Sequence, residues 1–194
     1  MHLLRLSLLL AVCLMPQVAF GGLVVYSVAL SGPAESPANS SPGTGTGTIT
    51  FDDVLNTMRV QVSFSNLLGN VTNSHIHART ATPFSGTAGV ATQLPTFTGF
   101  PAGGTSGTYD NTFDMSLAAS FNGAYVTANG GTPGTAFSAL MQDALNGQAY
   151  LNIHSSQFGG GEIRGFLTAV PEPSSLLMLS MVAVPAYTLR RRRA

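Results

Sequence analysis

Three histidines and one glutamate are the residues best suited to carry chemistry. His75 and His77 stand one residue apart in "NSHIHART", His154 lies in "LNIHSS", and Glu162 follows in "GGGEIR". Neutral imidazole nitrogens are common ligands of zinc and copper(II), and a carboxylate oxygen can complete such a set. The sequence therefore indicates a candidate three-nitrogen, one-oxygen metal site made of His75, His77, His154 and Glu162.

Strand geometry would bring these side chains together. Residues i and i+2 of a strand point to the same face, about 6.6 Å apart along the chain, so His75 and His77 would lie side by side. His154 shares its strand parity with Asn152, whereas Leu151 and Ile153 occupy the opposite, apolar face. If the last two strands form a hairpin closed by "SSQFGGG", Glu162 lies almost opposite His154.

The same residues also suit a purely structural role. Histidines, Asn152 and a Glu162–Arg164 pair on one face can join neighbouring strands through hydrogen bonds. General acid–base catalysis by His154 with Glu162 lacks a recognisable nucleophile motif, because the chain has no G-x-S-x-G and no evident carboxylate pair. A polar network and a metal site both stay open, and an enzyme is not expected.

The elements that would position these residues are short strands. In "TMRVQVSFSN" the apolar residues alternate with polar ones, which is typical of a half-buried strand, and "TGTGTITFD" is its expected hairpin partner through "DDVLNT". Further strands are expected at 24–30, 71–77, 89–94, 108–117, 148–154 and 162–168.

One stretch favours a helix. In "TAFSALMQDALNGQ" the apolar residues recur at helical spacing up to Gly147, where a left-handed cap residue is expected. Segments 32–47, 95–107 and 129–135 are rich in Gly, Pro and Thr and should be loops. The pattern predicts one all-β domain, an antiparallel β-sandwich or Greek-key barrel with one short helix.

The chain begins with a predicted export signal over residues 1–22. Arg5 precedes the apolar run "LSLLLAVCLMP" and the small-residue exit "QVAFGG". Cys13 is the only cysteine, so removal of the signal would leave none in the domain at 23–170. That excludes a disulfide scaffold, a thiol enzyme and a zinc-thiolate site.

The other end, 171–194, carries three consecutive features. Pro171, Glu172 and Pro173 are followed by an apolar stretch at 174–189, and then by the arginines Arg190, Arg191, Arg192 and Arg193. Sixteen helical residues span about 24 Å, which is short of a roughly 30 Å hydrocarbon core. Together these features resemble the PEP-CTERM sorting signal, which implies an exosortase and the export machinery as partners. An ordinary C-terminal membrane anchor is the alternative.

Either interpretation places the domain outside the cytoplasm, at the cell surface or in the extracellular space, with membrane contact through the C-terminal helix. Residues 23–170 contain three arginines, no lysine and seven carboxylates, which gives a net charge of −4. Phosphate binding needs clustered basic residues, so nucleic acid is not an expected partner.

Three stretches of the domain resemble the CHRD domain, a module repeated in the vertebrate antagonist chordin and found singly in many bacterial exported proteins. They are "ALSGPAESPANSSPGTGTGTITFD", "FSNLLGNVTNSHIHA" and "ALNGQAYLNIHSSQFGGGEIRGFL". The family pattern includes a Ser-Gly with a nearby Glu, here Ser31, Gly32 and Glu35, a His-x-His, and an Asn-x-His followed by Gly-Glu-x-Arg-Gly. The loop "SSQFGGG" departs from that pattern.

The resemblance implies an immunoglobulin-like β fold and little chemistry. The expected function is a non-catalytic binding module at the surface or in the extracellular matrix, with an extracellular polysaccharide or a surface protein as partner. The alternative is a secreted zinc- or copper-binding protein. Copper-zinc superoxide dismutase also carries His-x-His on a β-sandwich, but only three histidines follow the predicted signal, too few for that site.

Overall fold

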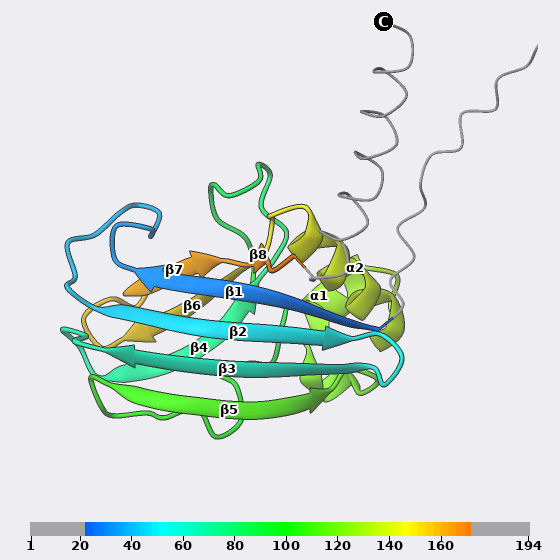
Figure 1. The fold of residues 1–194 in the computed structure, drawn as a ribbon, viewed down its shortest axis with the longest axis horizontal. Helices are drawn as coiled ribbons and strands as arrows, with labels where there is room; N and C mark the ends of the chain where they lie inside the picture. Colours follow the sequence, from blue (N-terminus) through cyan, green and yellow to red (C-terminus); the bar gives the residue numbers. More distant parts are fainter. Residues whose placement is uncertain (1–21, 172–194) are drawn as a thin grey trace, which may run out of the picture.

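The computed structural model describes residues 22–171, which form a mostly antiparallel β domain with few helices (Figure 1). Nearly all of the expected export signal and sorting sequence, including the apolar stretch at 174–189, lies outside the described residues. Among residues 22–171, no helix reaches the length and apolar character that a membrane crossing requires.

Eight strands build one sheet. They are β1 (Leu23–Ser31), β2 (Thr44–Asp52), β3 (Thr57–Ser65), β4 (Val71–His77), β5 (Gly107–Asp114), β6 (Tyr150–Ser155), β7 (Ile163–Phe166) and β8 (Thr168–Ala169). Their spatial order is β4-β6-β7-β1-β2-β3-β5, and β8 pairs with β1. The sheet curls like a half-barrel, with β4 and β6 passing behind β1 and β2 in Figure 1. The predicted antiparallel β class is therefore confirmed, and in the described residues the strands form a single curled sheet.

The predicted hairpin at 44–65 is confirmed. β2 and β3 pair antiparallel over their whole length, with Thr44 opposite Ser65 and Asp52 opposite Thr57. The apolar residues of β3 are all buried, as the alternation predicts: Met58, Val60, Val62 and Phe64. On the exposed side, Arg59 forms an ion pair with Asp110 of β5.

The prediction of a strand at 89–94 is wrong. Only isolated bridges form there, between Val90 and His77 and between Thr92 and Phe121. The segment instead runs irregularly along β4, where Ala91 N–H donates to the carbonyl of Ile76. Pro95 follows directly and lacks the N–H that a ladder needs, which limits regular pairing at this edge.

The predicted helix is confirmed as α2 (Pro133–Leu145), and its start lies two residues before the expected position. Thr132 caps it, because its hydroxyl accepts from the N–H of Thr135 in a capping box. Gly147 has φ +68°, the expected left-handed conformation. The 3₁₀ turn η1 (Ala118–Ser120) and the six-residue α1 (Gly123–Ala128) were not predicted, because they are too short to show helical periodicity.

The hydrophobic core fills the space between the concave side of the sheet and the helices. Phe51 of β2 contacts Tyr26 of β1 and Phe137 of α2 edge-to-face, with ring centroids 5.6 and 5.9 Å apart. Ile76, Leu151 and other apolar residues of β4, β6 and β7 join the same core. This burial supplies the main driving force for closing the sheet around α2.

A glycine sets how closely β7 approaches β1. A Cβ at Gly165 would collide with the backbone carbonyl of Ala29. We expect Gly165→Ala to lower the free energy of unfolding by about 2 kcal/mol, because the strands must separate to fit the methyl group. Urea unfolding measures this, with Gly160→Ala as the control, since a Cβ there meets nothing within 4 Å. Equal stabilities of the two variants would contradict this reading of β7 packing.

Candidate metal centre

The strands β4, β6 and β7 carry a second set of buried residues on the face that points away from the hydrophobic core. Core residues such as Ile76, Leu151 and Ile153 alternate with residues of the other face. We call that group the histidine face: His75, His77, Tyr150, Asn152, His154 and Arg164. Each of them is no more than 9% exposed.

Loops cover the histidine face and explain its burial. Arg164 donates to the backbone carbonyls of Ala34 and Gly86, which belong to two different loops. The rings of His77 and His154 bond to the carbonyls of Ala88 and Gly159. A polar surface of the sheet is thus enclosed by backbone from three loops, and its polar atoms must find partners inside that enclosure.

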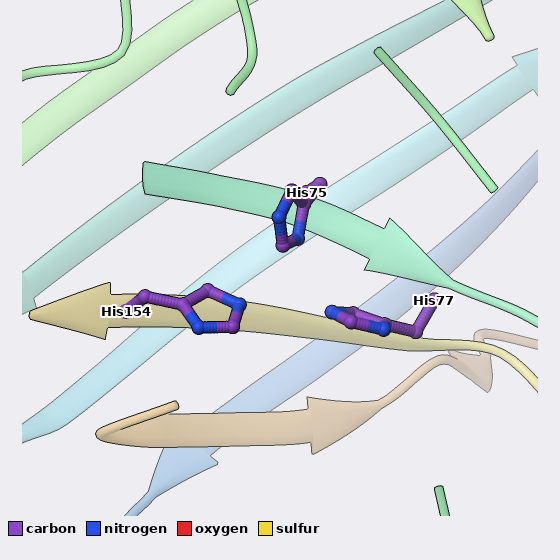
Figure 2. A group of neighbouring side chains, drawn as sticks. All are labelled: His75, His77 and His154. Carbon is purple, nitrogen blue, oxygen red and sulfur yellow. The ribbon is translucent and has the colours of Figure 1, made fainter. Parts of the chain in front are cut away.

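The three histidines converge on one point. His75 and His77 come from β4 and His154 from the adjacent β6, where Asn152 pairs with His75 and Asn73 with His154. One ring nitrogen from each histidine lies within 4.8 Å of the others. Figure 2 shows the three rings gathered over β4 and β6, and the centroid of His75 lies 4.8 Å from that of His77 and 4.7 Å from that of His154.

Backbone carbonyls fix the tautomers of two of these rings. Nδ1 of His77 lies 2.8 Å from the carbonyl oxygen of Ala88, and Nδ1 of His154 lies 2.9 Å from that of Gly159. A carbonyl can only accept, so Nδ1 carries the proton in both rings and Nε2 keeps its lone pair. Both Nε2 atoms, and Nδ1 of His75, are buried without a hydrogen-bond partner in the described protein. Metal-binding histidines are oriented by the same kind of second hydrogen bond.

Burial also keeps the three rings uncharged. Desolvation, with repulsion from His77 and His154, lowers the pKa of His75 to about 3. Desolvation lowers the pKa of His77 to about 4 despite the opposing bond to Ala88, and burial lowers the pKa of His154 as well. At neutral pH all three imidazoles are therefore neutral, which is the form that binds a metal ion.

Glu162 does not join this group, although it lies at the expected position beside His154. Its N–H bonds to the carbonyl of Ile153, but its carboxylate points elsewhere. Oε1 accepts from the Ser41 hydroxyl at 2.6 Å and from the N–H of Leu68, and Oε2 accepts from the N–H of Gly69 at 3.1 Å. Burial raises the pKa of Glu162, but hydrogen bonds from these groups and Ser155 outweigh it, so the net shift is downward. These hydrogen bonds hold the Glu162 carboxylate in a structural role, so it does not supply the predicted fourth metal ligand.

The predicted Glu162–Arg164 pair does not form either. Arg164 lies 3.8 Å from the carboxylate of Glu35 instead, with both side chains almost fully buried. Asn152 lies on the histidine face as expected, but its Oδ1 has no hydrogen-bond partner in the described protein. In residues 22–171, the side chains of His77 and His154 bond to backbone carbonyls rather than to these polar neighbours.

Sequence reasoning gave no role to Tyr150 or to the carboxylate of Glu35. The Tyr150 ring stacks on His77 with centroids 4.8 Å apart and planes 3° apart, and the Arg164 guanidinium carbon lies 4.8 Å from the Tyr150 centroid. Burial raises the pKa of Glu35 to about 7, against the lowering effect of Arg164. Strand parity could have found Tyr150, but no sequence pattern ties Glu35 to Arg164.

Unpartnered polar atoms concentrate in this region. Six buried side-chain nitrogen or oxygen atoms of the described residues lack a hydrogen-bond partner, and Tyr26 Oη is the only one that lies in the hydrophobic core. The other five belong to Glu35 and to the histidine face. Such a concentration is unusual, because buried polar atoms are normally paired. It points to a ligand rather than to a polar network that joins neighbouring strands.

Comparison with known proteins gives one match. The CHRD domain family matches residues 26–167, which span strands β1 to β7 and include all three histidines. In searches of curated proteins and of solved structures, nothing matches the chain. Because the matched region covers well over half of the 194 residues, this protein belongs to the CHRD domain family.

Proposed function

We propose that this CHRD-family protein is an exported, non-catalytic binding module that holds a zinc or copper(II) ion between His75, His77 and His154. The observation that carries the proposal is the meeting of three neutral imidazoles, each with one ring nitrogen within 4.8 Å of the others and each with a buried nitrogen that has no hydrogen-bond partner in the described protein. Without an ion, these buried unpartnered nitrogens carry a cost in free energy. A metal ion satisfies all three at once.

The spacing of the nitrogens is wider than a bound ion requires. Zinc–nitrogen bonds of about 2.0–2.1 Å place tetrahedral ligands about 3.4 Å apart, compared with separations of up to 4.8 Å here. Small rotations of the rings close that gap, since His75 and His77 lie on one strand and His154 on its hydrogen-bonded neighbour. Three nitrogen ligands suit zinc and copper(II) better than calcium or magnesium, which prefer oxygen.

Three protein ligands leave a further coordination position for a group from outside the cluster. The candidate group in the described residues contains only the three histidines, with no cysteine, aspartate or glutamate. A position of this kind lets the ion bind a carboxylate or hydroxyl of an extracellular partner. The proposal of a non-catalytic role is supported by the histidine bonds, which go to backbone carbonyls and not to a nucleophile.

Export and surface attachment are part of the same proposal and are supported by the two terminal sequences, "LSLLLAVCLMP" and the Pro-Glu-Pro segment with its arginine cluster. Export followed by exosortase processing predicts that intact-mass analysis of the native protein finds both the N-terminal and the C-terminal segments removed. Recovery of the unprocessed chain from the cytoplasmic fraction would argue against it.

Metal content gives the direct test. We expect about one zinc or copper ion per untagged chain, and a loss of at least tenfold in the His75→Ala/His77→Ala variant, because removing two of three ligands abolishes chelation. Elemental analysis by mass spectrometry measures this. Asn73→Ala, on the same strand and with its side chain hydrogen-bonded only to Thr72, is the matched control that should keep the metal.

Two outcomes would contradict the proposal. One is a folded wild-type protein that retains no metal after incubation with zinc and copper and then dialysis. The other is a double variant that retains as much metal as Asn73→Ala. Either result would leave the histidines as structural residues of a metal-free CHRD module.

A further inference from the structure

A second site lies beside the histidine face, between two loops. A cavity of about 240 Å³ is lined by residues 35–39 of the β1–β2 loop and by Phe158, Gly160 and Gly161 of the β6–β7 loop. None of the three histidines lines it. Glu35 and Gly161 are buried, whereas Ser36, Pro37, Ala38 and Gly160 are exposed, so the cavity has a buried base and opens at the surface.

The base of this cavity holds the carboxylate of Glu35, which has one oxygen free to accept a hydrogen bond. Glu35 is 8% exposed, and its Oε1 has no hydrogen-bond partner in the described protein. Its neighbour Arg164 lies 3.8 Å from Oε2, which is too far for a hydrogen bond, and donates to Ala34 and Gly86 instead. A buried, unpaired carboxylate oxygen is costly, and a ligand that donates a hydrogen bond removes that cost.

Asn152 lies close to Glu35 but does not line the cavity. A Cβ at Gly161 would lie 2.6 Å from Glu35 Oε1 and 2.6 Å from Asn152 Oδ1, so these two oxygens lie at most about 5 Å apart. Asn152 Oδ1 is also buried and unpartnered. Glycine is required at position 161, because a Cβ there would collide with the side chains of Asn152 and Glu35.

We propose that this cavity binds one sugar ring of an extracellular polysaccharide through a hydroxyl group donated to Glu35. The hydroxyl supplies the donor that Oε1 of Glu35 lacks, and the volume suits a single ring. Phe158 and Pro37 line the cavity and offer apolar surface to the C–H face of the ring. An ammonium ligand is disfavoured, because its charge would lie next to the buried guanidinium of Arg164.

This site goes beyond the proposed metal centre and is independent of it. Burial raises the pKa of Glu35 to about 7, so the carboxyl accepts from a hydroxyl when ionised and can donate to one when protonated. Sugar binding therefore needs no metal ion. Both loops that form the mouth are exposed, so a terminal ring of a large polymer can enter.

Titration of the full-length protein with simple probes tests the site. The probes are the methyl glycosides of glucose, mannose, galactose and N-acetylglucosamine, with ethanolamine as the amine probe, followed by saturation-transfer NMR. We expect at least one glycoside to bind with a Kd on the order of 1 mM, since one ring makes few contacts. The same Kd is expected for chelator-treated and zinc-loaded protein, which separates this site from the metal centre.

Two variants locate the binding. Glu35→Gln should weaken it at least tenfold, and Gly160→Leu should abolish it by filling the mouth, where a Cβ meets nothing within 4 Å. Gly123→Leu is the matched control, because Gly123 also has open space around its Cβ but does not line the cavity. Gly160→Leu keeps the test decisive if Glu35→Gln fails to fold.

Several results would overturn the inference. They are binding of ethanolamine but of no glycoside, no binding of any glycoside, equal binding by the Gly123→Leu and Gly160→Leu variants, or glycoside binding that disappears on chelation. The last would assign the sugar to the metal ion instead of Glu35.

Discussion

Acidifying the metal-free protein is expected to destabilise it strongly through its buried histidines. Between about pH 7 and pH 4 their contribution to the free energy of unfolding should fall by several kcal/mol, on the order of 6. The reason is that burial lowers the pKa of His75 to about 3 and that of His77 to about 4, from 6.5 in an unfolded chain.

The direction of this pH effect on the free energy of unfolding follows from proton uptake. Below about pH 6.5 the unfolded chain gains protons on these histidines while the folded protein does not, so unfolding becomes more favourable. The stabilisation is complete above pH 6.5 and is lost as the pH falls towards the folded pKa values of about 3 and 4. His154, whose pKa burial also lowers, adds to the effect in the same direction.

Glu35 changes the free energy of unfolding with pH in the opposite direction, so its contribution has to be separated from that of the histidines. Burial raises its pKa from 4.5 to about 7, so the folded protein takes up this proton first, and falling pH between those values favours the folded state. Glu162 titrates below its ordinary value and so lies beneath the main window. A Glu35→Gln background removes the opposing contribution and leaves the histidines dominant.

Urea unfolding at a series of pH values measures the effect. The informative quantity is the difference in pH dependence between Glu35→Gln and the same protein with His75→Asn added, because groups common to both cancel. The added substitution should flatten the curve between pH 6.5 and 4. Parallel curves would show that His75 has an ordinary pKa and that the cluster is accessible to water.

The second large effect concerns Glu162, where we expect a loss of stability without a loss of metal. Glu162→Ala should lower the free energy of unfolding by about 4 kcal/mol, because it leaves the N–H groups of Leu68 and Gly69 and the Ser41 hydroxyl without their acceptor. The carboxylate contributes no ligand atom to the candidate metal group, so the metal bound per folded chain should stay unchanged.

Denaturant unfolding and elemental analysis on the same samples separate the two roles. Asp110→Ala is the matched control for removal of a carboxylate, since the Arg59–Asp110 pair is about half exposed and contributes little to stability. A Glu162→Ala protein that folds normally but has lost its metal would make Glu162 a ligand after all. It would also mean that the side chain leaves Ser41 when an ion binds.

Several parts of this protein follow from the sequence because they depend on local geometry. Alternation in β3 determines its buried face, and the same rule places His75 and His77 on one face of β4. The helical period and Gly147 predict α2 and its end. The CHRD motifs are contiguous, so the family is recognisable without any knowledge of the fold.

Other features depend on contacts between distant segments. The alternation of apolar residues cannot show which strands pair, so a single curled sheet with β1 between β7 and β2 was not distinguishable from two packed sheets. The carbonyls that orient His77 and His154 belong to loops, and any residue can supply a carbonyl. No sequence signal marks such partners.

For Glu162, the sequence predicts the position of the residue but not the direction of its carboxylate. The sequence alone determined that it lies beside His154 on the neighbouring strand, because hairpin register is local. Only the tertiary structure decided where its carboxylate points, since Ser41, Leu68 and Gly69 reach it from segments more than 90 residues away. A buried carboxylate turns to the side that offers most hydrogen-bond donors, and long-range folding determines which side that is.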